Sequence, residues 1–324
     1  MSSSVPFAEI VRNGFVEGHH YGSVVALAPD GSTAWSLGDV RAAILPRSAN
    51  KPIQALAMLT LGLDLPPDLL ALACASHSGE RFHQEGVRRI LASVGLSESA
   101  LGNIEDYPLD EVERDAALRL GLPPTRLAMN CSGKHAAMLA TCVAAGWPLE
   151  GYLGTDHPLQ TGIRKVFEEA TGEEAYVAID GCGAPLLSAS LTGLARAFAS
   201  IASATEGPAA RIAAAVRAHP EYVSGTRRDE YALHRAVPGL VGKMGAESVY
   251  AVALPDGRAW ALKTDDGGQR ARPVVMAAAL VRDGVDREPG VDGAALRATG
   301  VSVVYGGGVA VGEVTALLPA ASGS

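Results

Sequence analysis

A serine and a lysine stand three positions apart in Arg47-Ser48-Ala49-Asn50-Lys51-Pro52, at the predicted start of a helix. Residues i and i+3 lie on one helix face, so the amine of Lys51 can reach the hydroxyl of Ser48. A hydroxyl becomes a nucleophile when a base takes its proton, and a lysine acts as that base when burial or a second cation lowers its pKa. We expect Ser48 to cap this helix, and a capping serine beside a solvated lysine is the alternative interpretation. The apolar positions of the helix are Ile53, Leu56 and Leu59.

Two further stretches place polar side chains where a predicted helix ends or begins. In Cys74-Ala75-Ser76-His77-Ser78-Gly79-Glu80, two serines and a histidine are suited to line a cleft, although an ordinary polar helix end has the same composition. The stretch Met129-Asn130-Cys131-Ser132-Gly133-Lys134-His135 leads into an apolar helix. It lacks the first glycine of a phosphate-binding loop, so we reject nucleotide binding. A glycine at a helix start still presents backbone N–H groups to an anion.

The four cysteines form two groups. Two are predicted to be buried in the core, and two are candidates for reactive or metal-binding thiols. Cys74 and Cys142 have apolar neighbours and are predicted to be small core residues. Cys182 lies between two glycines in Ile179-Asp180-Gly181-Cys182-Gly183, so we expect an accessible thiol. Together with Cys131 it has the chemistry to hold a soft divalent metal, zinc first, and two unligated cleft thiols are the alternative. The side chains that could complete such a set are Asp180, His135 and Lys134.

A second lysine is predicted to stand at a strand end in Leu262-Lys263-Thr264-Asp265-Asp266-Gly267. Penicillin-recognising enzymes combine Ser-x-x-Lys with a Lys-Thr-Gly at this place, and here Asp265 replaces the glycine. Lys263 would lower the pKa of Lys51 by like-charge repulsion and help it to act as a base. A surface lysine beside a turn is the alternative interpretation.

The elements that position these stretches change from strands to helices and back. Strands are expected at 21–27 and 33–36, and again at 248–254 and 258–264, where Pro255-Asp256-Gly257 indicates a hairpin. Because hairpins dominate, strands from both ends of the chain should join one antiparallel sheet, giving an α+β fold. We predict a single catalytic unit, 1–324, with an α/β lobe (1–65 and 240–324), a mostly helical lobe (66–239) and a cleft between them. Expected helices are 66–74, 81–94, 110–119, 134–145, 158–170, 185–200, 206–218, 228–236 and 270–284, and the last strands are 301–305 and 314–318.

Composition excludes several classes of function. The 324 residues are 48% apolar, which is enough for a sizeable core. A formal charge of −8 without a long basic run argues against nucleic acid or an anionic membrane as partner. The first residues lack the features of a signal peptide, and no apolar run approaches the roughly 20 residues of a membrane span. We therefore expect a cytoplasmic protein with a small-molecule substrate.

Taken together and in this order, the motifs closely resemble the rhizobial-type L-asparaginases, the asparaginase II group. The resemblance covers nearly the whole chain, and five dispersed motifs in register are highly specific. The matching segments are Ser48-Ala49-Asn50-Lys51-Pro52, Ala75-Ser76-His77-Ser78-Gly79-Glu80, Asn130-Cys131-Ser132-Gly133-Lys134-His135, Asp180-Gly181-Cys182-Gly183, Gly242-Lys243-Met244-Gly245-Ala246-Glu247 and Lys263-Thr264-Asp265-Asp266-Gly267.

This resemblance implies a fold, a catalytic set and a cofactor. The fold is that of serine β-lactamases and serine-dependent glutaminases, and the chain is expected to form a homodimer. Two serine–lysine pairs are implied, Ser48 with Lys51 and Ser76 with Lys263, where motif alignment alone selects Ser76 over Ser78. Zinc is implied on Cys131, Lys134 and Cys182, with Asp180 close by. The expected substrate-binding residues are Arg47, Asn50, His77, Glu80, Asn130 and Asp180.

The reaction that these residues predict is hydrolysis of L-asparagine to L-aspartate and ammonia through a covalent acyl-enzyme on Ser48. Asp180 or Glu80 is expected to receive the α-amino group of the substrate. A glutaminase of the same fold is one alternative, since a single methylene separates the substrates. A β-lactamase is disfavoured because Ser76-His77-Ser78 replaces Ser-Asp-Asn. A non-catalytic amino-acid-binding module is the alternative of another class.

Overall fold

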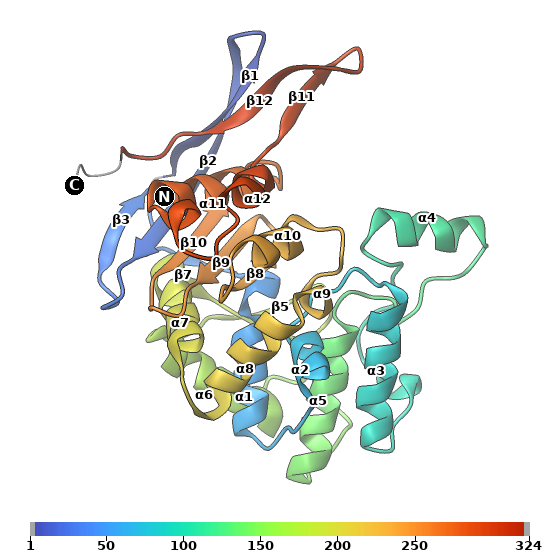
Figure 1. Cartoon of the computed structure of the whole chain (residues 1–324). Coiled ribbons are helices and arrows are strands. Elements are labelled where there is room, and N and C mark those ends of the chain that lie inside the picture. Colours follow the sequence, from blue (N-terminus) through green and yellow to red (C-terminus); the bar gives the residue numbers. More distant parts are fainter. Residues whose placement is uncertain (1–3, 321–324) are drawn as a thin grey trace. The chain divides into compact units, whose positions relative to one another are not determined.

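The computed structural model describes residues 4–320 (Figure 1). The chain folds into two compact units. The first comprises the described residues of Met1–Ala49, Ala189–Ser203 and Ala232–Ser324. The second comprises Asn50–Ser188 and Ala204–Tyr231. The division differs from the expected lobes because helix α1 (Lys51–Thr60) belongs to the helical unit and α7 (Leu191–Ser203) to the sheet unit.

The first unit is built on an antiparallel sheet of eight strands drawn from both ends of the chain. The order is β11-β12-β1-β2-β10-β9-β8, with β3 paired to β2. Blue N-terminal strands lie beside red and orange C-terminal strands in Figure 1, which confirms the predicted α+β sheet. The strands are β1 (Val5–Arg12), β2 (Phe15–Leu27), β3 (Thr33–Leu37), β8 (Val241–Gly245), β9 (Val249–Ala253), β10 (Ala259–Thr264), β11 (Val303–Gly306) and β12 (Val309–Ala316).

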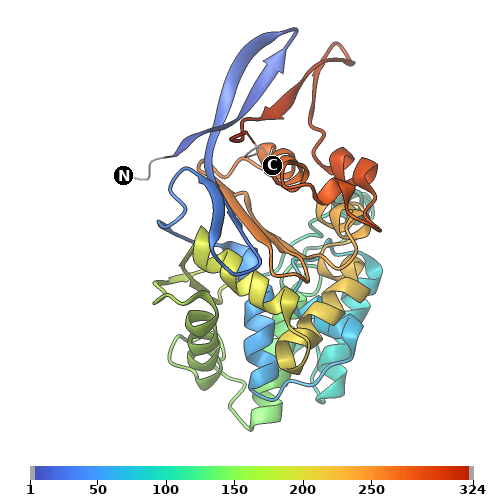
Figure 2. The ribbon, with the colours of Figure 1, turned by 60° about the vertical axis from the view of Figure 1, so that its left-hand side comes forward.

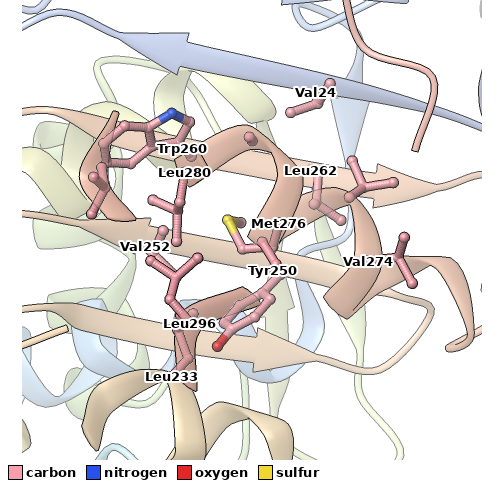
Figure 3. Close-up of a cluster of buried hydrophobic side chains, with 14 of the residues drawn as sticks. Val24, Leu233, Tyr250, Val252, Trp260, Leu262, Val274, Met276, Leu280 and Leu296 are labelled. Carbon is pink, nitrogen blue, oxygen red and sulfur yellow. The ribbon is translucent and has the colours of Figure 1, made fainter. Parts of the chain in front are cut away.

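One face of this sheet forms the apolar core drawn in Figure 3. Alternate residues of β9 and β10, such as Tyr250 and Trp260, point to this face and are fully buried. Burying such side chains contributes roughly 1.5–3 kcal/mol each. The helices that supply the rest of this core are α10 (Asp229–Ala236), α11 (Ala271–Arg282) and α12 (Gly293–Thr299), with the short helix η3 (Val285–Arg287).

The opposite face of the sheet packs against α7, the yellow helix that runs beside the orange strands in Figure 2. Pairing fixes which side chains share this face. Lys263 on β10 is opposite Val249 on β9, and Val249 is opposite Gly245 on β8. Directly opposed residues point to one side of an antiparallel sheet, so these three form a row. Because Leu262 belongs to the apolar core on the other face, Lys263 projects on the α7 side.

The second unit is mostly helical, as predicted. Nearly all expected helices are present within a few residues of their predicted limits. The helices of this unit, besides α1 and the first residues of α10, are α2 (Pro67–Ala73), α3 (Arg81–Ser93), η2 (Glu98–Ala100), α4 (Glu111–Arg119), α5 (Ser132–Ala145), α6 (Pro158–Thr171), α8 (Gly207–Ala218) and α9 (Pro220–Val223).

The predicted helix 185–200 is wrong in its first part. Residues Pro185–Leu187 form strand β6, which pairs with β5 (Val177–Ile179) around the Asp180–Gly183 turn. Ala189–Ser190 form β7, which pairs with β4 (Ala43–Ile44), and the helix α7 begins only at Leu191. A short apolar run has the same periodicity in a buried strand as in a buried helix, so sequence alone did not separate them.

Within residues 4–320, no helix is both long enough and apolar enough to cross a membrane. All four cysteines are buried, and none forms a disulfide within the described residues. Burial confirms the core assignment of Cys74 and Cys142. The expected accessible thiol of Cys182 is wrong, because this side chain is only 1% exposed.

Candidate active site

Ser48 lies in a short 3-10 turn, η1 (Arg47–Asn50), that runs directly into α1. The turn is closed by the Ala49 N–H, which donates to the carbonyl of Pro46 at 3.0 Å. The predicted capping role of Ser48 is therefore wrong: α1 starts at Lys51, its N-cap residue is Asn50, and no side chain caps it. Pro52 suits the first helical turn because its missing N–H would have no partner there. The boundary between the two units falls between Ala49 and Asn50, inside the Ser-x-x-Lys motif.

The turn that carries Ser48 rests on the end of β8. A Cβ added to Gly245 would lie 2.3 Å from the carbonyl oxygen of Pro46 and 3.1 Å from the nitrogen of Ala49. Only a glycine at position 245 permits this close approach of the turn to β8, which explains why the motif Gly242–Glu247 has a glycine there. Arg47 enters the turn with φ of 52°, a conformation that side chains rarely adopt. The turn is thus fixed by backbone packing on the same face from which Lys263 projects.

Lys263 is held at the end of β10 by two carbonyl groups. Its Nζ donates to the oxygen of Glu247 at 3.0 Å and to that of Thr264 at 2.9 Å. The side chain is half-buried, and burial lowers the pKa of Lys263 against the opposing effect of three nearby carboxylates. Arg47 adds a smaller lowering effect on the same pKa. The lysine predicted at a strand end is therefore an ordered, partly desolvated amine.

Lys51 is fully buried at the start of α1, with 1% of its surface exposed. Its Nζ donates to the Ala75 carbonyl at 2.7 Å and to Cys131 Sγ at 3.0 Å. The alternative of a solvated lysine is therefore wrong. The predicted contact between Ser48 and Lys51 stays a prediction.

The stretch after α2 contains two serines with different surroundings. Ser78 is fully buried and its hydroxyl donates to the Ser224 carbonyl at 2.7 Å. Ser76 is anchored by its backbone instead: its N–H donates to Val223 O at 3.2 Å and its carbonyl accepts from Arg228 at 2.6 Å. Within residues 4–320, the Ser76 hydroxyl has no counterpart of the hydrogen bond that occupies Ser78.

His77 is an internal residue of this stretch. Its Nδ1 accepts from the Gly79 N–H at 3.1 Å, which places the ring proton on Nε2, 2.8 Å from Ser132 Oγ. The hydroxyl of Ser132 in turn donates to Leu127 O at 2.8 Å. Burial holds the pKa of His77 well below its ordinary range, helped by His83 and Lys51. Both ring nitrogens are occupied within the unit, so the expected contact of His77 with substrate stays a prediction.

The carboxylate of Glu80 is also occupied. One oxygen accepts from the Thr226 N–H and the other from the Thr226 hydroxyl, each at 2.8 Å. Arg227 adds an ion pair at 3.4 Å. Asn50 differs, because its side chain is 2% exposed and its Nδ2 has no hydrogen-bond partner among residues 4–320. An unpaired buried amide N–H is a donor that a ligand can satisfy.

Cys131 and Cys182 interact directly in the interior of the helical unit. The interaction with Cys131 holds the pKa of Cys182 well below its ordinary value. The same contact, with burial, raises the pKa of Cys131. The Oδ1 of Asn130 lies 2.9 Å from Cys131 Sγ, and the Oδ2 of Asp180 lies 3.9 Å from Cys182 Sγ.

Two side chains of α5 complete the surroundings of the sulfurs. Lys134 Nζ donates to Cys182 Sγ at 3.2 Å. Burial opposes its charge, but the neighbouring sulfurs and Asp180 raise the pKa of Lys134 above its ordinary value. His135 interacts with the same sulfur, yet burial dominates and lowers its pKa to about 4. Its Nδ1 lies 2.7 Å from the Tyr152 hydroxyl, within hydrogen-bond distance.

This group of side chains fits a zinc ion. Zinc prefers four N or S ligands, and the two interacting sulfurs with the amine of Lys134, which lies 3.2 Å from Cys182 Sγ, supply three such donors. The described residues contain no set of three or more His, Cys, Asp and Glu side chains placed for a metal. A zinc site here therefore depends on Lys134. Such a ligand must lose its proton before it can coordinate.

Gly133 lies in the first turn of α5, and the expected contact of this turn's backbone N–H groups with an anion stays a prediction. A Cβ at this position would lie 2.6 Å from the Leu72 carbonyl, so the glycine is required by the close packing of α5 on α2.

Sequence reasoning missed two side chains that shape the helical unit's part of the site. Arg228 holds the carbonyl of Ser76, and its signal was the Arg227-Arg228 pair after Gly225. Tyr152 orients His135 from a loop, and no local pattern indicated it.

Comparison with known proteins identifies the family of this chain. The sequence profile described as L-asparaginase II matches residues 8–316. The chain belongs to this family. The resemblance predicted from the motifs is thereby confirmed, and the protein is a member of a family of amide hydrolases. No curated protein matches this member of the L-asparaginase II family.

Solved structures similar to this L-asparaginase II family member are distant in sequence. Mglu in its native form is 13% identical with a TM-score of 0.46, and the match covers 81% of this chain but only 60% of Mglu. A β-lactamase from Mycobacterium bovis is 15% identical with a TM-score of 0.40, covering 80% and 94% of the two chains. The hydrolase EstCE1, which has promiscuous acyltransferase activity, is 12% identical with a TM-score of 0.40, covering 75% and 88%.

Proposed function

We propose that the protein is an L-asparaginase that hydrolyses L-asparagine to L-aspartate and ammonia with Ser48 as nucleophile. The observation that carries this proposal is the packing of Gly245 on the Pro46–Ala49 turn. This packing puts the turn of Ser48 on the same sheet face as Lys263, which stands two strands away from Gly245. Strands are separated by roughly 4.8 Å, so the backbones of β8 and β10 are about 10 Å apart. An amino-acid substrate is large enough to span the distance between these two strands.

Lys51 is proposed as the base for Ser48. A neutral amine has two N–H donors and one lone pair, and both donors are used by Ala75 O and Cys131 Sγ. The lone pair then remains for the Ser48 proton. The Ser48 oxygen attacks the side-chain amide carbon, the C–N bond breaks, and the nitrogen leaves as ammonia after taking up a proton. Water hydrolyses the resulting ester.

Ser76 and Lys263 are proposed as the pair that delivers the proton to departing ammonia. The unengaged hydroxyl of Ser76 and the lowered pKa of Lys263 support this role, and the occupied hydroxyl of Ser78 argues against the alternative serine.

Substrate recognition is assigned to polar side chains of the predicted set. Asn50 Nδ2 is suited to the substrate carboxylate or amide oxygen, since it is buried and unpaired. Asp180 or Glu80 is assigned to the α-ammonium group, and Thr226 and Arg227 already contact the Glu80 carboxylate. Arg47 and Asn130 remain candidates for further contacts.

Zinc is proposed on Cys131, Lys134 and Cys182. When bound, the ion would orient substrate or shape the pocket, because a serine nucleophile is already present to attack the amide. A homodimer remains our expectation.

The test is ammonia release from L-asparagine and L-glutamine in parallel, with elemental analysis of the same sample. We expect kcat/KM for asparagine to exceed that for glutamine by about 10–200-fold, the discrimination that one methylene provides. The reverse preference would make the protein a glutaminase. No ammonia from either substrate would favour the binding module instead.

A further inference from the structure

The three-residue turn between β8 and β9 joins the two parts of the sheet unit's site. It runs from Ala246 to Ser248, because Gly245 pairs with Val249. Glu247 and Ser248 have φ values of 56° and 57°, in the left-handed region that side chains other than glycine rarely adopt. Such conformations cost free energy and persist only where the surroundings enforce them. The contacts that enforce this turn involve the catalytic candidates.

One set of contacts binds the turn to the end of β10. The Ser248 and Thr264 hydroxyls are 2.7 Å apart, and the Thr264 N–H donates to Ser248 O at 3.2 Å. The main-chain oxygen of Glu247 accepts from Lys263 Nζ at 3.0 Å. Gly267 closes over the side chain, since a Cβ there would lie 2.2 Å from Glu247 Oε2.

A second contact joins the same residue to the turn of Ser48. The Glu247 carboxylate lies 3.6 Å from Arg47 Nη1, and Arg47 directly precedes Ser48. Arg47 has a positive φ, so it too is held in a conformation that it would not adopt alone. Glu247 thus contacts Lys263 through its backbone and Arg47 through its side chain.

We propose that Glu247 is a positioning residue of the reaction, which fixes Lys263 and the Ser48 turn relative to each other. The proposal rests on the proposed function for its catalytic consequence. The Glu247–Arg47 ion pair is partly exposed and contributes little to stability. We therefore infer that its role is to hold Arg47 and Glu247 in position. Glu247 also supplies negative charge beside Lys263, together with Asp265 and Asp266 and against Arg47.

Three variants separate these effects. Glu247→Gln keeps the shape and removes the charge, whereas Glu247→Gly also relieves the positive φ while keeping the main-chain carbonyl. Glu247→Asp keeps the charge. The matched control is Glu288→Gln, which removes a comparable glutamate that pairs with Arg258 at 2.7 Å in the same unit.

The first measurement is the titration of Lys263 by NMR in protein labelled with 13C-lysine. The chain has only five lysines, so the Lys263 signal can be assigned with Lys263→Arg, and the exposed Lys165 serves as internal reference. In Glu247→Gln and Glu247→Gly the pKa of Lys263 should move to lower pH, because the carboxylate that raises it is gone. Glu247→Asp should return it towards the wild-type value, and Glu288→Gln should leave it unchanged.

The second measurement is kcat and KM for ammonia release. The Gln and Gly variants should lower kcat by about 10-fold or more with a smaller change in KM, since misplaced catalytic groups act on the chemical step. Wild-type kcat and an unchanged Lys263 titration would overturn the proposal, as would equal losses in Glu288→Gln. If wild type releases no ammonia from any amide, the proposed function fails, and the NMR titration alone decides the inference.

Discussion

Lys51 Nζ lies 3.0 Å from Cys131 Sγ in the interior of the helical unit. The amine proposed as base therefore shares a hydrogen bond with a sulfur proposed as zinc ligand. Because Cys131 also contacts the Cys182 sulfur, changes at the sulfur pair reach Lys51 through a single atom. Binding of a metal and activation of the nucleophile should consequently depend on the same cysteine.

Replacing Cys131 should affect both properties at once. We expect Cys131→Ser to reduce bound zinc by at least about 10-fold, since a hydroxyl is a poorer ligand than a thiolate. The same variant should lower kcat, because the contact with Lys51 is altered. Elemental analysis and ammonia release check the two effects. Cys142→Ala, at a buried cysteine of the helix α5 that follows Cys131, is the control and should change neither. Full zinc content in Cys131→Ser would remove Cys131 from the ligand set.

Removing the amine of Lys51 should abolish most of the activity. Lys51→Met retains the length and apolar stem of the buried side chain, and we expect kcat to fall by about 10²–10⁴-fold, the usual contribution of a general base. Thermal unfolding and steady-state kinetics of the same preparation distinguish this from loss of fold. A folded variant with kcat within a few-fold of wild type would rule out Lys51 as the base.

The two serines after α2 should respond differently to substitution. Ser78→Ala removes the buried hydrogen bond to Ser224 O and should lower the free energy of unfolding by about 1–3 kcal/mol. Ser76→Ala should instead leave stability within about 0.5 kcal/mol and lower kcat. Urea unfolding and kinetics on both variants test this pair. A catalytic loss confined to Ser78→Ala would reverse the assignment.

Acid should destabilise the protein through a buried histidine. Burial lowers the pKa of His83 to about 4, against 6.5 for an ordinary histidine. Between these values the unfolded chain binds more protons, so the stability contributed at neutral pH is lost as pH falls. The loss should reach about 2 kcal/mol at pH 5. Urea unfolding at pH 7 and pH 5 measures it. In His83→Gln, which cannot titrate, this part of the pH dependence should disappear, and its survival would contradict the assignment.

Local signals predicted much of the fold. Pro255-Asp256-Gly257 between two β-type runs predicted the β9–β10 hairpin, and that hairpin fixes Lys263 at a strand end. The apolar periodicity of most helices was equally informative, because one face of each is buried. The joining of N- and C-terminal strands followed from the lack of any strand–helix–strand alternation that a parallel sheet requires.

Tertiary contacts decided what the sequence could not. Glycines around Cys182 indicated exposure, but the sulfur is buried by the loop packing on Lys134 and His135. Ser48 was expected to cap a helix, but the approach of Gly245 to Pro46 closes a 3-10 turn first. The contact of Glu247 with Arg47 joins positions about 200 residues apart in sequence, which no local pattern reveals.

The most direct test of the central claim is ammonia release from L-asparagine by wild type and Ser48→Ala at equal concentration. The account predicts that wild type releases ammonia and that the variant, folded to the same degree by circular dichroism, loses activity on the order of 10⁴-fold or more. Equal rates in the two proteins would contradict a serine nucleophile at position 48.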